Sequence, residues 1–113
     1  MHEQDATRDI LDRALRQAAE KHADLITDVY VVMGAISDYT EDAVRFHWGE
    51  LSKGTIAEEA RLHIRKSEAE LQCMACFTRY RPVDGAIQCP RCGSNGAKIL
   101  AGDEFYLEAL DVE

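Results

Sequence analysis

The chain has 113 residues, of which 46% are hydrophobic and 30% are charged; these values are typical of one globular domain and exclude a mainly disordered chain. The net charge of −8 at pH 7 repels phosphate, which argues against sequence-independent binding of DNA or RNA. No apolar run approaches the roughly 18–20 residues that a membrane helix needs.

The start of the chain, Met1-His2-Glu3-Gln4-Asp5, lacks the basic and apolar segments of a signal peptide. We therefore expect a cytoplasmic protein with no membrane attachment. Disulfides are disfavoured in that compartment, so the four cysteines of the chain need another explanation.

The first predicted element is an amphipathic helix from about Glu3 to His22. Its apolar residues recur at the spacing of one helical stripe: Ile10, Leu11, Ala14, Leu15 and Ala18. A strand is predicted from Ile26 to Met33, because this segment is rich in β-branched residues, and Gly34 ends it.

A second helix is predicted from about Thr40 to Ser52, where Asp38 and Glu41 resemble a capping box. A second strand follows from about Ala60 to Lys66. The segment from Lys98 to Glu113 is predicted as one further strand with a bulge near Glu108 or Ala109, where the apolar alternation slips.

The segment 71–96 differs in kind, because all four cysteines and both prolines lie in it and helical periodicity is lost. The order of helix, strand, helix, strand, cysteine-rich insert and strand predicts an α+β fold. Two helices would pack on a roughly three-stranded sheet, and a small cysteine-bound lobe would be inserted before the last strand.

Cys73, Cys76, Cys89 and Cys92 form a C-x2-C-x12-C-x2-C pattern, which is typical of a closed tetrahedral site with four sulfur ligands. Soft thiolates select zinc or iron, and a site without an open position is structural. A rubredoxin-like iron site and a nucleic-acid-binding zinc ribbon are the alternatives. The residue after Cys76 is not the glycine usual in rubredoxin-like sites, and the negative net charge argues against nucleic acid.

Met1 and His2 together form a chelating group if the amino terminus is free. The free amine, the His2 amide nitrogen and the His2 ring can close fused rings around one ion, and nitrogen donors in a plane suit Ni(II) or Cu(II). The amide nitrogen or carboxylate of Glu3 could complete the set. The alternative is that His2 is simply an exposed second residue.

The sequence shows no phosphate-binding loop, no nucleophile paired with a histidine at a recognisable spacing, and no zinc site with an open position. We therefore expect a binding protein and not an enzyme.

The sequence resembles the HypA/HybF family of nickel metallochaperones for [NiFe]-hydrogenase maturation. The resemblance runs nearly end to end and is carried by the following segments: Met1-His2-Glu3, Gly34-Ala35-Ile36-Ser37, Gly54-Thr55-Ile56-Ala57-Glu58, both Cys-x2-Cys pairs, Cys89-Pro90-Arg91-Cys92-Gly93-Ser94, Gly102-Asp103-Glu104 and Asp111-Val112-Glu113.

The resemblance implies a nickel-binding α/β domain with a mixed sheet, which we assign to residues 1–70 and 97–113, and a zinc-ribbon domain, residues 71–96. It implies Ni(II) as cargo at His2, with Glu3 and the main chain of Met1, and structural Zn(II) at the four cysteines. The implied partners are the GTPase HypB and the [NiFe]-hydrogenase large subunit. The oligomeric state is left open between a monomer and a homodimer. Some members have an acidic residue near the nickel site, where Thr40 stands here.

Overall fold

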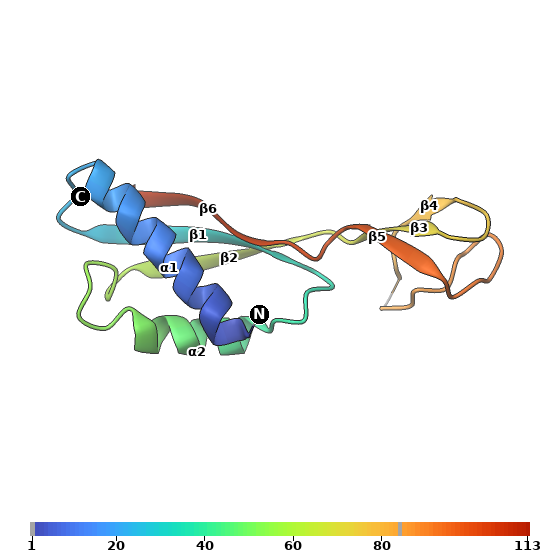
Figure 1. Cartoon of the computed structure of the whole chain (residues 1–113), viewed down its shortest axis with the longest axis horizontal. Helices are drawn as coiled ribbons and strands as arrows, with labels where there is room; N and C mark the ends of the chain where they lie inside the picture. The colour runs from blue at the N-terminus through green and yellow to red at the C-terminus, as the bar shows by residue number, and fades with distance from the viewer. Residues whose placement is uncertain (1, 84) are drawn as a thin grey trace. The chain divides into compact units, whose positions relative to one another are not determined.

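The computed structural model describes residues 2–83 and 85–113. The chain forms two compact units, each built from separate stretches of sequence (Figure 1). The helical unit contains the chain up to Val32, Tyr39–Arg65 and Phe105–Glu113. The ribbon unit contains Met33–Asp38 and Lys66–Glu104.

The helical unit contains α1 (Glu3–Glu20) and α2 (Glu41–Leu51), which pack against each other, and α1 also packs on β6 (Phe105–Val112). The strand order of its sheet is β2-β1-β6, where β1 is Ile26–Gly34 and β2 is Arg61–Ser67. The prediction of two helices on a three-stranded sheet is therefore confirmed. Among the described residues, neither helix is both long enough and apolar enough to cross a membrane.

The sheet is mixed, as the contacts along β1 show. The N–H of Glu113 donates to Leu25 O at the start of β1, and the Thr27 hydroxyl donates to Asp111 O, so β6 runs antiparallel to β1. β2 follows β1 through the crossover helix α2, and its contacts advance in the same direction as β1, from Asp28–His63 to Ala35–Ser67. The β1-α2-β2 segment is thus a parallel crossover unit.

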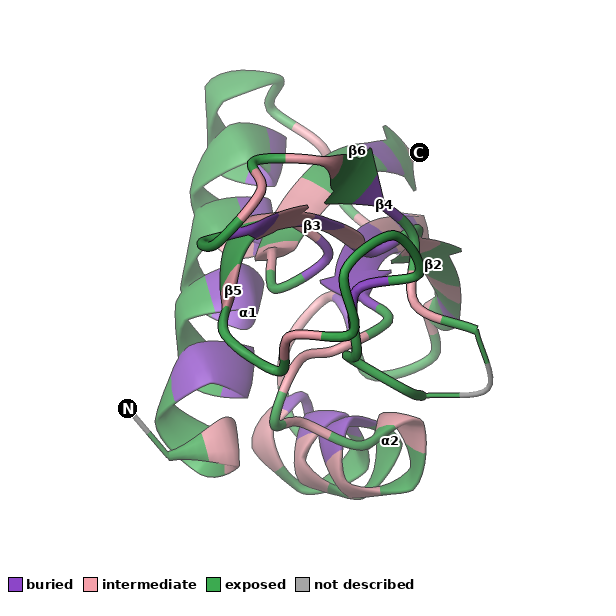
Figure 2. Cartoon of the chain, turned by 90° about the vertical axis from the view of Figure 1, so that its right-hand side faces the viewer, coloured by how far each residue is buried: buried purple, intermediate pink, exposed green. Residues whose placement is uncertain are grey.

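The core of the helical unit is aliphatic, and the buried positions of α1 lie along one side of the helix (Figure 2). The predicted apolar stripe supplies these positions except for Ala6 and Thr7, and its member Leu15 is half-buried. Trp48 is 4% exposed on α2. The helices and strands contribute these buried aliphatic side chains to the core: Ile10, Leu11, Ala14, Val29, Val31, Val44, Leu62 and Leu110.

The helix α2 begins differently from the prediction. Its N-cap is Thr40, whose hydroxyl accepts the N–H of Ala43 at 3.2 Å. The predicted capping box based on Asp38 is therefore wrong. Thr40 is an equally good cap residue, and its extended backbone puts its hydroxyl over the first turn of the helix.

The ribbon unit contains a second three-stranded sheet of order β4-β3-β5, formed by β3 (Glu70–Cys73), β4 (Arg79–Tyr80) and β5 (Ala97–Ala101). Both pairings are antiparallel. The prediction of one strand over 98–113 is wrong, because the chain leaves the ribbon sheet at Gly102, where φ is +106°, and enters the other sheet at Phe105. The strand β5 belongs to the ribbon unit.

Three backbone segments of the ribbon unit meet at Gly34, Ala69 and Gly102, which we call the glycine crossing. The N–H of Ile36 donates to Gly102 O at 2.9 Å, and the N–H of Gly34 donates to Glu104 O at 2.7 Å. A Cβ at Gly34 would lie 1.9 Å from Gly102 O, and a Cβ at Gly102 would lie 2.5 Å from Ala69 Cα. Only glycine allows this approach.

The carboxylate of Glu104 ties the crossing together, because it accepts the Ser67 hydroxyl at 2.6 Å and the N–H of Gly102 at 3.0 Å. These two donors, the hydroxyl first, hold the pKa of Glu104 below its ordinary value. A carboxyl whose pKa is lowered by folding stabilises the fold above the pKa of the unfolded chain, and this contribution is lost as the pH falls toward the folded pKa.

We expect Glu104→Gln to unfold at a lower temperature than the parent at pH 7, because the amide carries no charge for these donors. As the pH falls below roughly 4.5, the difference should shrink, because the unfolded parent chain takes up a proton there and the native carboxylate does so at its lower pKa. Calorimetric melts of both proteins across this range measure the difference. Acid also displaces metal from thiolates in both proteins, so only the difference between them is interpreted; a difference independent of pH would contradict the prediction.

Candidate metal centres

The four cysteines lie in two tight turns that face each other. Cys73 and Cys76 belong to the turn after β3, and Cys89 and Cys92 to the turn before β5. Each turn is closed by a backbone bond across it, from the N–H of Phe77 to Cys73 O at 3.0 Å and from the N–H of Gly93 to Cys89 O at 2.9 Å.

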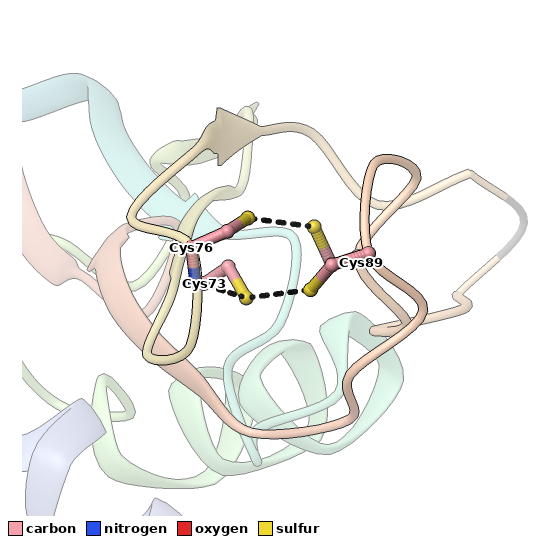
Figure 3. A group of neighbouring side chains, drawn as sticks. Cys73, Cys76 and Cys89 are labelled. Atoms are coloured by element: carbon pink, nitrogen blue, oxygen red, sulfur yellow. Dashed lines mark hydrogen bonds between the residues drawn. The ribbon is translucent and has the colours of Figure 1, made fainter.

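The four Sγ atoms all lie within 4.8 Å of one another, and we call them the cysteine cluster. Cys73 and Cys92 are 3.5 Å apart and Cys76 and Cys89 are 3.6 Å apart, with Cys73 and Cys76 facing Cys89 across the cluster (Figure 3). A tetrahedral ion with metal–sulfur bonds of about 2.3 Å places its sulfurs about 3.8 Å apart. The cluster therefore has the size and ligand set of a zinc-ribbon site.

Backbone N–H groups point at the sulfurs and favour their anionic form. The N–H groups of Ala75 and Cys76 lie 3.4 and 3.5 Å from Cys73 Sγ, and that of Arg91 lies 3.4 Å from Cys89 Sγ. The Thr78 hydroxyl, 3.2 Å from Cys76 Sγ, is the largest of the effects that lower the pKa of Cys76 to about 6.

Mutual repulsion opposes this effect. The N–H of Ser94 favours the thiolate of Cys92, but the three neighbouring sulfurs, Cys73 first, together with burial raise the pKa of Cys92 to about 11. Thiolates this close repel one another, and a bound divalent cation removes the conflict. The donor set thus fits a divalent metal.

The cysteines are also half of the core of the ribbon unit. The buried residues of that core are Leu71, Cys73, Tyr80 and Cys89. Leu71 and Tyr80 are paired across β3 and β4, and the Tyr80 hydroxyl donates to Ile87 O. Leu71 and Tyr80, with the partly buried Ile36 and Ala97 packed against them, form a small core for a fold of this size, and a bound metal would add stability through the sulfurs.

The amino-terminal candidate ligands lie at the start of α1, with Met1 outside the described residues. His2 is the N-cap of α1, in an extended conformation with φ −76° and ψ 153°; its side chain makes no capping hydrogen bond and is exposed. Its carbonyl accepts the N–H of Ala6 at 3.0 Å. The imidazole of His2 is accordingly not used to stabilise the helix.

The carboxylate of Glu3 holds this end of the chain to the start of α2. Glu3 Oε2 accepts the N–H of Thr40 at 3.1 Å, and Glu3 O accepts the Thr7 hydroxyl at 2.7 Å. The contact joins residues 37 positions apart in the chain, and no local sequence pattern indicates it. It places Glu3 and Thr40 side by side at the helix starts.

The other histidines lie elsewhere. His22 is exposed just after α1, with φ 54°, and His47 is half-buried on α2 beside Phe46. His63 is exposed; its Nε2 lies 2.8 Å from Asp28 Oδ1, and its ring stacks on Tyr30 at 4.6 Å between ring centroids. Among the described residues, the cysteine cluster is the one group of His, Cys, Asp or Glu side chains close enough to hold a metal.

The family profile described as "Hydrogenase/urease nickel incorporation, metallochaperone, hypA" matches residues 1–112. The chain belongs to the HypA family. The HypA family consists of nickel-incorporation metallochaperones, so the recognition made from the sequence is confirmed.

Two relatives named hydrogenase maturation factor HypA illustrate the match. One from Dehalococcoides mccartyi is 31% identical over 113 residues, covering 100% of this chain and 95% of the relative. One from Moorella thermoacetica is 33% identical over 114 residues and is covered completely.

The solution structure of the Ni metallochaperone HypA from Helicobacter pylori superposes with a TM-score of 0.71 at 23% identity, covering 99% of this chain and 97% of that one. The α+β fold expected from the sequence is the HypA fold.

Proposed function

We propose that this HypA-family chain binds Ni(II) at its amino terminus and delivers it for [NiFe]-hydrogenase maturation, while Zn(II) at the cysteine cluster holds the ribbon unit together. The observation that carries the nickel proposal is the position of His2. An exposed, extended N-cap whose ring makes no capping bond leaves the side chain free to bind an ion.

The proposed nickel donors are nitrogen atoms. The amine of Met1, the amide nitrogen and ring of His2, and the amide nitrogen of Glu3 form a set that suits square-planar Ni(II). Glu3 is the first residue of α1, and the first N–H groups of a helix have no carbonyl partner within it, so its amide nitrogen is free for a metal. The Glu3 carboxylate accepts the N–H of Thr40 and so fixes the start of α1 next to the proposed site.

The two metals are proposed to occupy separate sites in separate domains. Four sulfur ligands at tetrahedral spacing suit Zn(II), and the structural ion replaces the core that the ribbon lacks. Our proposed division is a nickel-binding domain, 1–70 and 97–113, and a zinc-ribbon domain, 71–96.

The proposed activity is carriage and transfer, without catalysis, in the cytoplasm. The GTPase HypB and the [NiFe]-hydrogenase large subunit are the partners that we propose. Ligands on a chain end can be removed one at a time, which suits transfer from one protein to another.

The test is calorimetric titration of Ni(II) into four zinc-loaded proteins: the native start, a form whose Met1 amine is acetylated, His2→Ala and the control His22→Ala. We expect His2→Ala to lose more affinity than the roughly 10–100-fold that removal of an outer-shell partner costs. His22→Ala should bind as the parent does. The acetyl group should weaken binding, because it converts the amine into an amide without moving His2.

Equal nickel affinities in all four proteins would show that the amino terminus is not the site. Nickel bound through sulfur in the X-ray absorption spectrum of the zinc-loaded protein would show that the two metal sites are not separate.

A further inference from the structure

One face of the ribbon sheet carries two exposed basic side chains, Arg79 and Lys98. In the register of the three strands, Gln72 of β3 lies between Arg79 of β4 and Lys98 of β5. Side chains alternate along a strand, so these three share one face, while Leu71 and Tyr80 on the other face are buried. Arg79 and Lys98 are both exposed.

These two cations differ from their basic neighbour. Arg81 is paired with Glu68 at 2.9 Å. Neither Arg79 nor Lys98 has an acidic partner within 4 Å in the part of the chain that the structure describes. Their charge is therefore available to another molecule.

An exposed aromatic residue borders this pair. Phe77 lies in the β3–β4 turn and is 67% exposed. Its carbonyl oxygen accepts a hydrogen bond from the side-chain amide of Gln72 at 3.1 Å. Its φ is +63°, in the left-handed region that a bulky residue avoids and glycine adopts freely. Gly93, at the same place in the other cysteine turn, has φ +78°, so this conformation belongs to the turn itself.

Charge is distributed very unevenly along the chain. Residues 71–101 contain four basic side chains (Arg79, Arg81, Arg91 and Lys98) and one acidic side chain (Asp84), a net charge of +3. The total is −8, so the rest of the chain carries −8 − 3 = −11. A divalent ion with four thiolates adds negative charge, but Cys73 is next to Gln72 on β3 and therefore lies on the opposite face of the sheet.

We propose that the face formed by Gln72, Phe77, Arg79 and Lys98 binds an acidic segment of a partner protein that also carries an apolar side chain. Carboxylates would pair with the two cations, Arg79 in bidentate geometry, and the apolar side chain would pack on the ring of Phe77. The strongly negative remainder of the chain repels nucleic acid, so protein is the favoured source of the anions. The inference goes beyond nickel carriage and does not depend on it.

The test is an NMR titration of isotope-labelled, zinc-loaded full chain, without nickel, with a short synthetic peptide of Asp and Glu around one Leu. We expect shifts centred on Phe77, Arg79 and Lys98 that weaken as salt is raised. Arg79→Glu and Lys98→Glu should each lower the affinity roughly tenfold or more. The matched control Arg16→Glu, which changes an exposed arginine of α1, should bind as the parent does.

Phe77→Gly separates docking from folding. Glycine relieves the left-handed strain, so this variant should retain zinc and melt no lower than the parent, yet bind the peptide more weakly. Unchanged peptide affinity in all three face variants would overturn the proposal. So would tighter binding of an oligonucleotide than of the peptide, or self-association of the parent that Arg79→Glu abolishes, since the occupant would then be nucleic acid or a second copy.

Discussion

Cys92→Ser is expected to unfold the ribbon unit while the helical unit keeps its structure. Cys92 is exposed, so the substitution removes no core packing and acts through the metal. Structural zinc contributes roughly 10–16 kcal/mol of apparent binding free energy in small zinc domains. Besides two of the ligands, the buried core of the ribbon unit consists of Leu71 and Tyr80, with the partly buried Ile36 and Ala97 packed against it, and these side chains cannot replace such a contribution.

The measurement is metal content together with amide chemical-shift dispersion for residues 71–101. Ala75→Ser is the matched control, because it places a hydroxyl in the other metal-binding turn without removing a sulfur, and it should retain one zinc and a folded ribbon. A dispersed spectrum of 71–101 in metal-free Cys92→Ser protein would contradict the prediction. A red protein containing iron would instead point to the rubredoxin-like alternative.

Gly34→Ala should be among the most destabilising single-methyl changes in the chain. The added Cβ would lie 1.9 Å from Gly102 O and 2.6 Å from Asp103 N, and both are backbone atoms that cannot rotate away. One of the three segments of the glycine crossing must then separate from the others. We expect a loss in the free energy of unfolding that exceeds the roughly 1–3 kcal/mol of ordinary overpacking.

Gly49→Ala makes the same chemical change but is expected to raise the free energy of unfolding instead of lowering it. Gly49 lies in α2 with nothing within 4 Å of the added Cβ, so alanine should stabilise the chain by roughly 0.5–1 kcal/mol. Denaturant unfolding of both variants measures the contrast. If the two substitutions had equal effects, the close approach at the crossing would not be a real constraint.

Local sequence patterns correctly predicted the elements that are specified by residues close together in the sequence. The apolar stripe of α1 and the β-branched run of β1 correctly identified both, and the cysteine spacing identified the four side chains that the fold brings together. In each case the signal and the structure depend on residues close in the sequence.

The errors arise where the structure depends on distant residues. The segment 98–113 has strand preference throughout, but its division at Gly102 depends on the approach of Ala69 and Gly34. The contact between Glu3 and Thr40 joins the starts of two helices that are far apart in the sequence. No periodicity in either segment could reveal such a contact.

The interleaved order of the two units has a consequence for how the protein is made. Chain synthesis proceeds from the amino end, and domains generally fold as they emerge. The strand β6 pairs with the start of β1, through Glu113 and Leu25, yet it is translated after every cysteine. The ribbon unit can therefore bind its ion while the helical unit, most of which is translated earlier, still lacks β6, the strand that completes its sheet.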